Sequence, residues 1–461
     1  MKSIKSIMSV MALAGMALLG SCENDNINPR DFGGVTTDST ATGSSDVITT
    51  ALASYPKGSI VWTKDTTLTE SFKVPEGVSL YIEPGVTVTA NSKANPPIEL
   101  VVLGNLYCMG TADKPVTFTS DAKKPEAWGG IICGYNSEEV VLNHTNFNYA
   151  GATPSENSIS FQNHLFKTEI DGGVPAFHFC NVNGRFVITN CVFNESYNDQ
   201  TYFTGGSCII ANNLFKDSGN EKDGGEAINF KSGCKADIAG NVIYNACTNA
   251  FKLSNSGVSE EIPSSQLNIY NNTMINCGWR RTKNKKGGSV WLEKGIEPVF
   301  VNNIIYDCRF GVKQPDKDGA GKGAVCTPNY LFASTAAGVS QFSASESGVM
   351  YYQTDVHSSK AGDMDPLFVN YSLTKGMNIN CESDDQTKGA PQYFVDGWDF
   401  HLKAGSPALN ASIPAVTPLW SNGLVFIGLK KVIFKDIKND MDYRFYSPVP
   451  AARYGAFGLA E

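Results

Sequence analysis

The chain has 461 residues and a formal net charge of −8, and this acidic balance argues against general nucleic-acid binding. Charged residues make up only 18% of the chain and glycine occupies 44 positions, a composition that favours strands and turns over surface helices. The 12 cysteines include no CxxC pair and the five histidines are not at zinc-ligand spacing, which argues against a zinc site. We expect most of the cysteines to fill the core as small apolar residues.

The N-terminus has the pattern of a secretory signal. Lys2 and Lys5 precede an apolar run from about Ile7 to Gly20, which is too short to span a bilayer comfortably. The Leu-Gly-Ser-Cys sequence that ends at Cys22 resembles the lipobox of bacterial lipoproteins. This resemblance implies a signal peptide over residues 1–21 and lipidation of Cys22, so the membrane is an expected partner through the lipid anchor.

Residues 22–46 are predicted to form the lipidated cysteine and a flexible linker, because Asp, Asn, Gly, Ser and Thr dominate this stretch. The segment Cys22 to Asp25 resembles the acidic export signal that sends some Gram-negative lipoproteins to the outer face of the outer membrane. That resemblance implies a surface-exposed protein that is lipid-anchored in the cell outer membrane. The rest of the chain is long enough for one solenoid or two ordinary domains.

Five segments in the middle of the chain repeat one pattern. Each begins with Asn, has a large apolar residue about three positions later and ends in Ser or Cys: 190–196, 212–218, 241–247, 271–277 and 302–308. Asparagine tolerates the left-handed backbone of a sharp corner, and stacked amides can hydrogen-bond from coil to coil. The spacing is about that of one β-helix coil. The final residues are predicted to form an inward column of small side chains, namely Ser196, Ser218, Cys247, Cys277 and Cys308.

A second set of short segments lies between these repeats. The first and third residues of each are apolar and the middle one is not, which is typical of a strand with one buried face: 177–179, 228–230, 251–253, 290–292 and 310–312. No helical period is evident between Val47 and Leu402, so the fold class is predicted to be all-β. A two-sheet sandwich is the alternative, but sandwiches have closer strands and no recurring Asn-to-Cys segment.

The flanking segments resemble right-handed parallel β-helix proteins of the pectate-lyase-like superfold. The resemblance rests on the strand and Gly-corner alternation of 74–88, on its continuation at 100–106 and 115–119, and on exit sequences at 365–369, 399–409 and 453–457. It implies a parallel β-helix solenoid over residues 47–410 and a C-terminal capping segment over 411–461. Lyases, hydrolases, epimerases, adhesins and inert surface proteins share this fold, so it does not name a function.

The repeat also assigns residues to the outer face of one sheet. If the strands align, Asn229, Lys252, Trp291 and Lys313 form an outward column about 4.8 Å apart, with Lys231 and Glu293 beside it. Tryptophan stacks on a pyranose, and arginine holds a carboxylate or sulfate with two hydrogen bonds. A groove for an anionic sugar chain is therefore predicted from this column and the basic loop that follows Trp279: Asn229, Lys252, Trp291, Lys313, Arg280, Arg281 and Lys283.

The resemblance also implies candidates for catalysis on this face. Polysaccharide lyases of the fold use a Lys or Arg base, often with calcium, and its hydrolases use paired carboxylates. The candidates are Lys252, Arg280 or Arg281 as the base, and Asp223 with Glu226 as calcium ligands or as a carboxylate pair. Neither set forms a family signature and no acidic run makes a calcium cage. We therefore predict no metal and no cofactor, with Ca²⁺ as the alternative.

Three functions remain open at the level of the sequence. The chain is a surface lipoprotein that binds or handles extracellular polysaccharide, a polysaccharide lyase or glycoside hydrolase that acts on an acidic glycan, or a structural or adhesive surface protein without catalysis. Basic loops are commonly solvated turns, and outer-face lysines commonly belong to exposed sheet surface. The basic residues are therefore also consistent with a structural or adhesive protein. We expect a monomer with no nucleic-acid partner.

Overall fold

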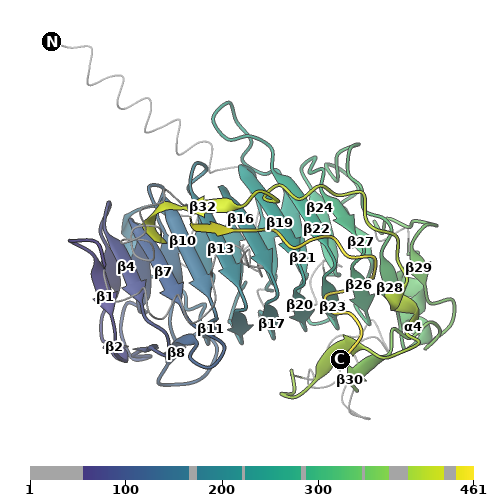
Figure 1. Cartoon of the computed structure of the whole chain (residues 1–461), viewed down its shortest axis with the longest axis horizontal. Helices are drawn as coiled ribbons and strands as arrows, with labels where there is room; N and C mark the ends of the chain where they lie inside the picture. The colour runs from purple at the N-terminus through teal and green to yellow at the C-terminus, as the bar shows by residue number, and fades with distance from the viewer. Residues whose placement is uncertain are drawn as a thin grey trace.

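The computed structural model describes residues 55–165, 174–220, 224–281, 287–344, 348–372, 393–429 and 443–460. They form a right-handed parallel β-helix, in which successive coils stack along one long axis (Figure 1). Within β1 to β27, strands pair with the strand three places before and after them in sequence, so a coil contributes one strand to each of three parallel sheets. Beyond them, β28 and β29 extend one of these sheets. The predicted all-β solenoid is confirmed.

The three sheets, here called A, B and C, account for most of the strands. Sheet A contains β1 (Ile60–Trp62), β4 (Ser79–Ile82), β7 (Asn105–Met109), β10 (Glu139–Asn143), β13 (Arg185–Thr189), β16 (Gly206–Ala211), β19 (Cys234–Ala239), β22 (Gln266–Tyr270) and β25 (Val299–Val301). Sheet B contains β2 (Thr66–Leu68), β5 (Thr87–Ala90), β8 (Val116–Ser120), β11 (Thr145–Asn148), β14 (Val192–Asn194), β17 (Leu214–Lys216), β20 (Val242–Tyr244), β23 (Thr273–Ile275), β26 (Ile304–Tyr306), β28 (Tyr330–Phe332) and β29 (Val356–His357). Sheet C contains β3 (Phe72–Val74), β6 (Glu99–Val102), β9 (Gly130–Cys133), β12 (Phe177–Phe179), β15 (Thr201–Phe203), β18 (Ile228–Phe230), β21 (Phe251–Ser254), β24 (Val290–Glu293) and β27 (Val312–Lys313).

The remaining elements are short. Two antiparallel pairs lie outside the coils, β30 (Phe368–Asn370) with β31 (Asp399–Leu402) and β32 (Leu424–Phe426) with β33 (Tyr443–Phe445). Short helices within the described ranges include α3 (Ile159–Gln162), α4 (Ala336–Gln341) and a 3₁₀ turn at Pro407–Leu409. No helix in the described parts of the chain is long and apolar enough to cross a membrane.

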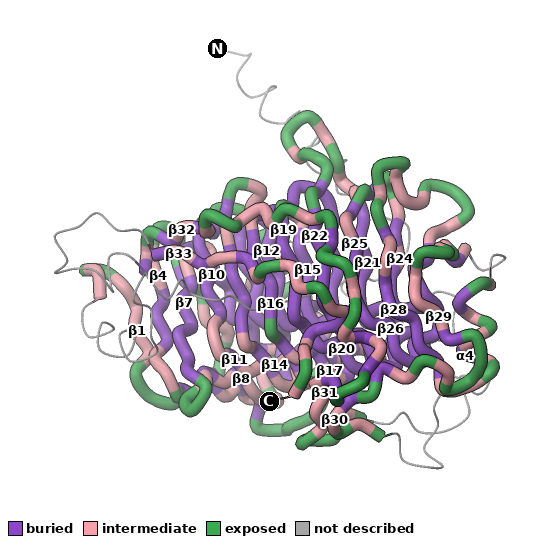
Figure 2. The backbone as a smooth tube through the Cα atoms, turned by 45° about the vertical axis from the view of Figure 1, so that its right-hand side comes forward, coloured by how far each residue is buried: buried purple, intermediate pink, exposed green. Residues whose placement is uncertain are grey.

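The interior of the coils is a continuous apolar core, and exposed residues gather at the turns (Figure 2). In sheet B four phenylalanines stack from coil to coil, with ring centroids 5.4, 4.5 and 4.8 Å apart along the series Phe118, Phe147, Phe193 and Phe215. The ten cysteines that the structure describes are buried thiols, and most of them belong to this core. The prediction that cysteines serve as small core residues is confirmed for these positions.

A ladder of asparagines follows the corner between sheets A and B. The Nδ2 atom of each residue donates to the Oδ1 of the next at 3.1, 2.8, 3.0 and 3.0 Å, along the series Asn213, Asn241, Asn272, Asn303 and Asn329. Each side chain thus satisfies buried polar groups of two coils. Asp355 ends the ladder by accepting a hydrogen bond from the Asn329 backbone N–H at 2.7 Å.

The ladder corrects the predicted alignment by one residue in one coil. Asn241 is equivalent to the second asparagine of the repeats that begin at 212, 271 and 302, because Gly240 (φ +72°) occupies the left-handed position held elsewhere by residues such as Asn271 (φ +52°). Ala246, and not Cys247, therefore aligns with Cys277 and belongs to the inward column. The prediction for Cys247 was wrong because glycine replaces asparagine at the corner without changing the backbone conformation.

Segments near the C-terminus cover the outer face of sheet A. Of the chain in this region, residues 416–429 and 443–448 lie along this face, within the yellow trace of Figure 1. The Glu139 carboxylate accepts hydrogen bonds from the backbone N–H groups of Ile427 and Gly428 at 2.8 and 2.9 Å, and Asp237 accepts one from the Trp420 N–H at 3.1 Å. Burial raises the pKa of Asp237. The predicted capping segment thus lies lengthwise along a sheet.

The outer faces of the sheets differ in what covers them. An apolar cluster that includes Phe394 and Phe400 packs on sheet B, and Leu165 and Val174 pack on the first coils of sheet C. Farther along sheet C the outward side chains become polar. This polar stretch, from β15 to β27, is where the predicted site residues lie.

Candidate functional site

The predicted column of outward residues is present on sheet C. Lys252 pairs in register with Asn229 on one side and with Trp291 on the other, and Trp291 pairs with Lys313. Their neighbours along each strand, such as Ile228 and Phe230, point into the core. The alternation of a half-buried strand therefore places the four predicted side chains on one face, in the predicted order.

The same column extends by two residues toward the N-terminal coils. Tyr202 on β15 pairs with Asn229, and His178 on β12 pairs with Tyr202. The strand that carries Tyr202 was not predicted, although Thr201, Tyr202 and Phe203 follow an Asn-to-Ser repeat in the same way as the other strands do.

Most side chains of the column are buried below the solvent-exposed surface of this face. Asn229, Lys252 and Lys313 expose only 0%, 4% and 2% of their surface, whereas Trp291 remains partly exposed. A buried ammonium group is costly unless nearby groups compensate its charge. The structure supplies such groups on adjacent coils.

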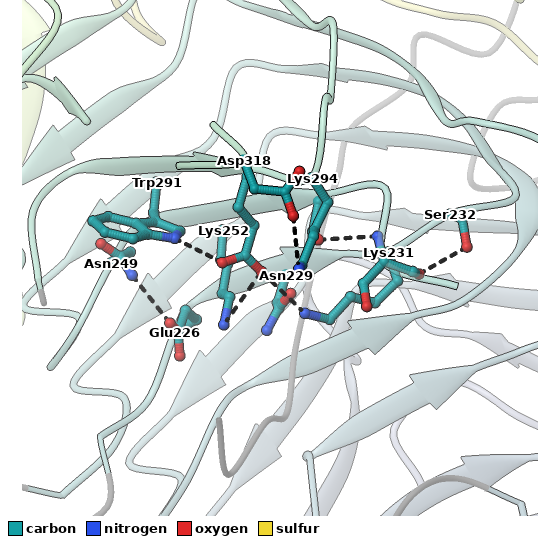
Figure 3. Close-up of polar contacts among 12 residues, drawn as sticks. Glu226, Asn229, Lys231, Ser232, Asn249, Lys252, Trp291, Lys294 and Asp318 are labelled. Carbon is teal, nitrogen blue, oxygen red and sulfur yellow. Dashed lines mark hydrogen bonds and ion pairs between the residues drawn. The ribbon is translucent and has the colours of Figure 1, made fainter. Parts of the chain in front are cut away.

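Glu293 is the centre of an ionic cluster with two of the lysines. Its Oε1 atom lies 3.7 Å from the Nζ of Lys231 and 3.7 Å from the Nζ of Lys252. Its Oε2 atom accepts a hydrogen bond of 2.9 Å from the indole N–H of Trp291. Figure 3 shows Trp291, Lys252 and Lys231 close together on this face. The glutamate thus fixes the indole ring and balances charge beneath it.

Aromatic rings stabilise the lysine at the far end of the column. The Nζ of Lys313 lies 3.9 Å from the ring centroid of Phe310 and 5.6 Å from that of Trp291. At these distances the ring quadrupoles attract the ammonium group. The Trp291 ring is therefore held on two sides, by the hydrogen bond to Glu293 and by the ammonium of Lys313.

A second polar group precedes the strands of sheet C at equivalent positions on three coils. The Glu226 backbone N–H donates to the Asp199 carboxylate, and Asn249 Nδ2 donates to Glu226 Oε1 at 3.0 Å. Asn229 Nδ2 reaches Asp199 Oδ2 at 3.5 Å and joins this group to the column. The Oδ1 atoms of Asn229 and Asn249 are buried and accept no hydrogen bond from the described residues. Glu226 and Asn229 were predicted as site residues from the sequence, whereas Asp199 and Asn249 were not.

Arg280 does not line the predicted groove, because its guanidinium group binds backbone carbonyls of neighbouring coils. Its guanidinium donates to the backbone carbonyls of Ser218, Gly219 and Asn245 at 2.6, 3.0 and 2.8 Å, and to the Asn245 side chain at 3.1 Å. Four of its five N–H groups are used in this way, so the residue ties three coil corners together.

Arg281 is the second arginine among the predicted site residues. The guanidinium of Arg281 lies against Gly224, where any side chain would collide with it. Lys283, Asp223 and Cys22 lie outside the described residues. The described parts of the chain contain no group of three His, Cys, Asp or Glu side chains that could hold a metal ion.

Comparison with known proteins places the chain in a family. The model of a pectate-lyase-like β-helix domain matches residues 55–325, which is more than half of the chain. No curated protein and no solved structure matches it. The matched range includes every coil that contributes a strand to sheet C, and hence the whole polar face described above. The chain belongs to the family of proteins with a pectate-lyase-like β-helix domain.

Proposed function

We propose that this protein is a lipid-anchored β-helix of the cell surface that binds extracellular polysaccharide along the polar outer face of sheet C. The observation that carries the proposal is the fixed, partly exposed ring of Trp291, held between Glu293 and Lys313. A fixed aromatic ring stacks on the apolar face of a pyranose with little loss of side-chain freedom.

The groups around this ring suit a ligand rich in hydroxyl groups. Lysine ammonium groups donate hydrogen bonds, while carboxylates and amide oxygens accept them. The face offers both kinds within four successive coils, from Asn229 on β18 to Lys313 on β27. A row of this kind, spaced by the strand separation of about 4.8 Å, fits an extended chain better than a single small metabolite.

The proposed location rests on the N-terminal sequence. Lipidation of Cys22 and a linker over residues 22–46 would hold the N-terminal end of the solenoid at the outer membrane and direct the coils toward extracellular polymer. Metabolic labelling with a palmitate analogue tests the anchor. Wild type is expected to incorporate the label and Cys22→Ala to incorporate none, and protease added to whole cells is expected to cleave the protein.

A glycan array tests the binding function. Wild type is expected to bind at least one class of oligosaccharide, and Trp291→Ala is expected to lose about tenfold or more in affinity. Trp62→Ala is the matched control, because Trp62 is also a partly buried tryptophan but lies on β1 at the other end of the solenoid. Binding to no glycan, or equal binding by wild type and Trp291→Ala, would contradict the proposal.

The same samples decide whether the protein is an enzyme. A lyase releases unsaturated uronates, and a hydrolase releases new reducing ends. Binding without either product supports a purely binding function. If wild type forms either product and Lys252→Ala or Glu226→Gln does not, the face is a catalytic site and not only a binding site.

A further inference from the structure

Glu293 is more exposed than the two lysines that it pairs with, and this difference bears on which class of polysaccharide the face can bind. Its side chain is 15% exposed, whereas those of Lys231 and Lys252 are 3% and 5% exposed. The carboxylate therefore lies on the solvent side of two ammonium groups that are almost fully buried. A ligand that approaches this part of the face meets the negative carboxylate before it meets either positive charge.

From this geometry we infer that the face selects neutral polysaccharides and that Glu293 is the residue that excludes anionic ones. The inference rests on the proposed function, since it assigns the class of sugar to the same site. It differs from the expectation drawn from the sequence, in which the lysines of this column attract an acidic sugar chain.

Charge compensation is the first reason. Lys231 and Lys252 share the Glu293 carboxylate, and at the rim Lys294 forms an ion pair of 2.8 Å with Asp318. Asp199 and Glu226 add two buried carboxylates beside Asn229 and Asn249. A uronate or sulfate over Trp291 and Asn229 would have to approach these carboxylates or displace Glu293, and like charges repel strongly where water is excluded. The ammonium of Lys313 is buried against the rings of Phe310 and Trp291.

The second reason is what a neutral sugar gains. A hydroxyl group loses little on leaving water if it finds an acceptor, and the Oδ1 atoms of Asn229 and Asn249 are buried acceptors without a described partner. These oxygens have almost no accessible surface, so a water molecule would have to bridge them to a ligand hydroxyl, whereas a ligand carboxylate cannot donate to them. The amide acceptors and the carboxylates thus both favour neutral polysaccharides over acidic ones.

Matched oligosaccharide pairs provide the test. Oligogalacturonate, oligomannuronate and oligoglucuronate are each compared by calorimetry with their carboxyl-reduced products, which keep the linkage and lose the charge. Wild type is expected to bind the neutral member of a pair at least tenfold more tightly than the acidic member. In Glu293→Gln this ratio is expected to fall to threefold or less, while Glu261→Gln, which removes an exposed carboxylate, is expected to leave it unchanged.

The outcomes separate the inference from the proposed function. Preference of the wild type for the acidic member, or an unchanged ratio in a folded Glu293→Gln variant, overturns the inference and leaves polysaccharide binding in place. Binding to neither member of any pair, nor to any glycan of the array, overturns the proposed function and with it the inference. The wild-type comparison alone decides the matter if Glu293→Gln does not fold.

Discussion

The Nζ of Lys252 lies 3.7 Å from the Oε1 of Glu293, across the boundary between β21 and β24. This contact joins two neighbouring coils on a face where the lysine is almost fully buried. Removing one partner of a buried ion pair costs far more than the net worth of the pair, because the other charge then remains in a low-dielectric site. The pair therefore makes the polar face sensitive to single substitutions.

The first prediction concerns this ion pair. Glu293→Gln is expected to lower the free energy of unfolding by about 1–3 kcal/mol, since two buried ammonium groups lose their shared carboxylate. Lys252→Met in the same chain is expected to recover about 1 kcal/mol or more of that loss. Urea denaturation of the two single variants and the double variant measures this coupling. Additive effects would show that Lys252 and Glu293 do not interact energetically.

The second prediction concerns the asparagine ladder. Asn272→Ala is expected to destabilise the protein by about 2–4 kcal/mol, because it removes the donor to Asn303 and the acceptor for Asn241 and leaves both buried. Asn183→Ala, in an exposed turn, is expected to change stability by less than about 0.5 kcal/mol. Equal thermal midpoints for the two variants would contradict a stabilising role of the ladder.

The third prediction concerns pH. Burial raises the pKa of Asp355 to about 6, although hydrogen bonds from Thr327 and Asn329 oppose the shift. The unfolded chain releases this proton near pH 4, so between pH 4 and 6 the folded protein binds more protons than the unfolded one. The contribution of this group to stability is therefore full below pH 4 and is lost as the pH rises through 6, by up to about 3 kcal/mol.

Asp355→Asn tests this sign, since asparagine keeps the acceptor for the Asn329 N–H and cannot ionise. The stability of the variant minus that of wild type is expected to be larger at pH 7 than at pH 4.5, as measured by thermal unfolding at the two pH values. Asp217 and Asp307, whose pKa values burial also raises to about 6, act in the same direction in both proteins. The same stability difference between variant and wild type at both pH values would contradict the assignment.

The fourth prediction concerns the segment that covers sheet A. Phe426 is fully buried between this segment and residues such as Tyr107 and Val187. Phe426→Ala is expected to lower the free energy of local unfolding of this segment by about 3–5 kcal/mol. Hydrogen exchange is expected to accelerate in 411–429 and 443–460 while the coil strands keep their protection. Uniformly faster exchange along the coils would show instead that segment and solenoid unfold together.

The sequence predicts the coils well because strand alternation and corner residues are local signals. Ile228 and Phe230 must point inward, so Asn229 must point outward, and the same holds for Lys252 and Trp291. The corner asparagine can be replaced by Gly240 without a change of backbone conformation, which is why one coil was misaligned by a residue. Local patterns thus give the column, with an error wherever two residue types satisfy the same conformation.

The parts of the site that sequence reasoning missed depend on contacts between distant positions. Asp199 and Asn249 lie at corners, where the period-two alternation no longer applies, and nothing local marks them as partners of Asn229 and Glu226. Arg280 resembles a ligand-binding arginine in sequence, but its acceptors are backbone carbonyls that any residue supplies. The burial of Lys252 follows from neighbouring coils and loops that its own strand does not specify.

Oxidative footprinting of Trp291 tests the central claim, that polysaccharide binds on the outer face of sheet C, most directly. Hydroxyl radicals oxidise accessible tryptophans, and mass spectrometry reports the extent at each position with and without the best oligosaccharide from the array. Saturating glycan is expected to reduce oxidation of Trp291 severalfold and to leave Trp62, on β1, unchanged. Bound glycan that leaves Trp291 as reactive as in the free protein would contradict this account.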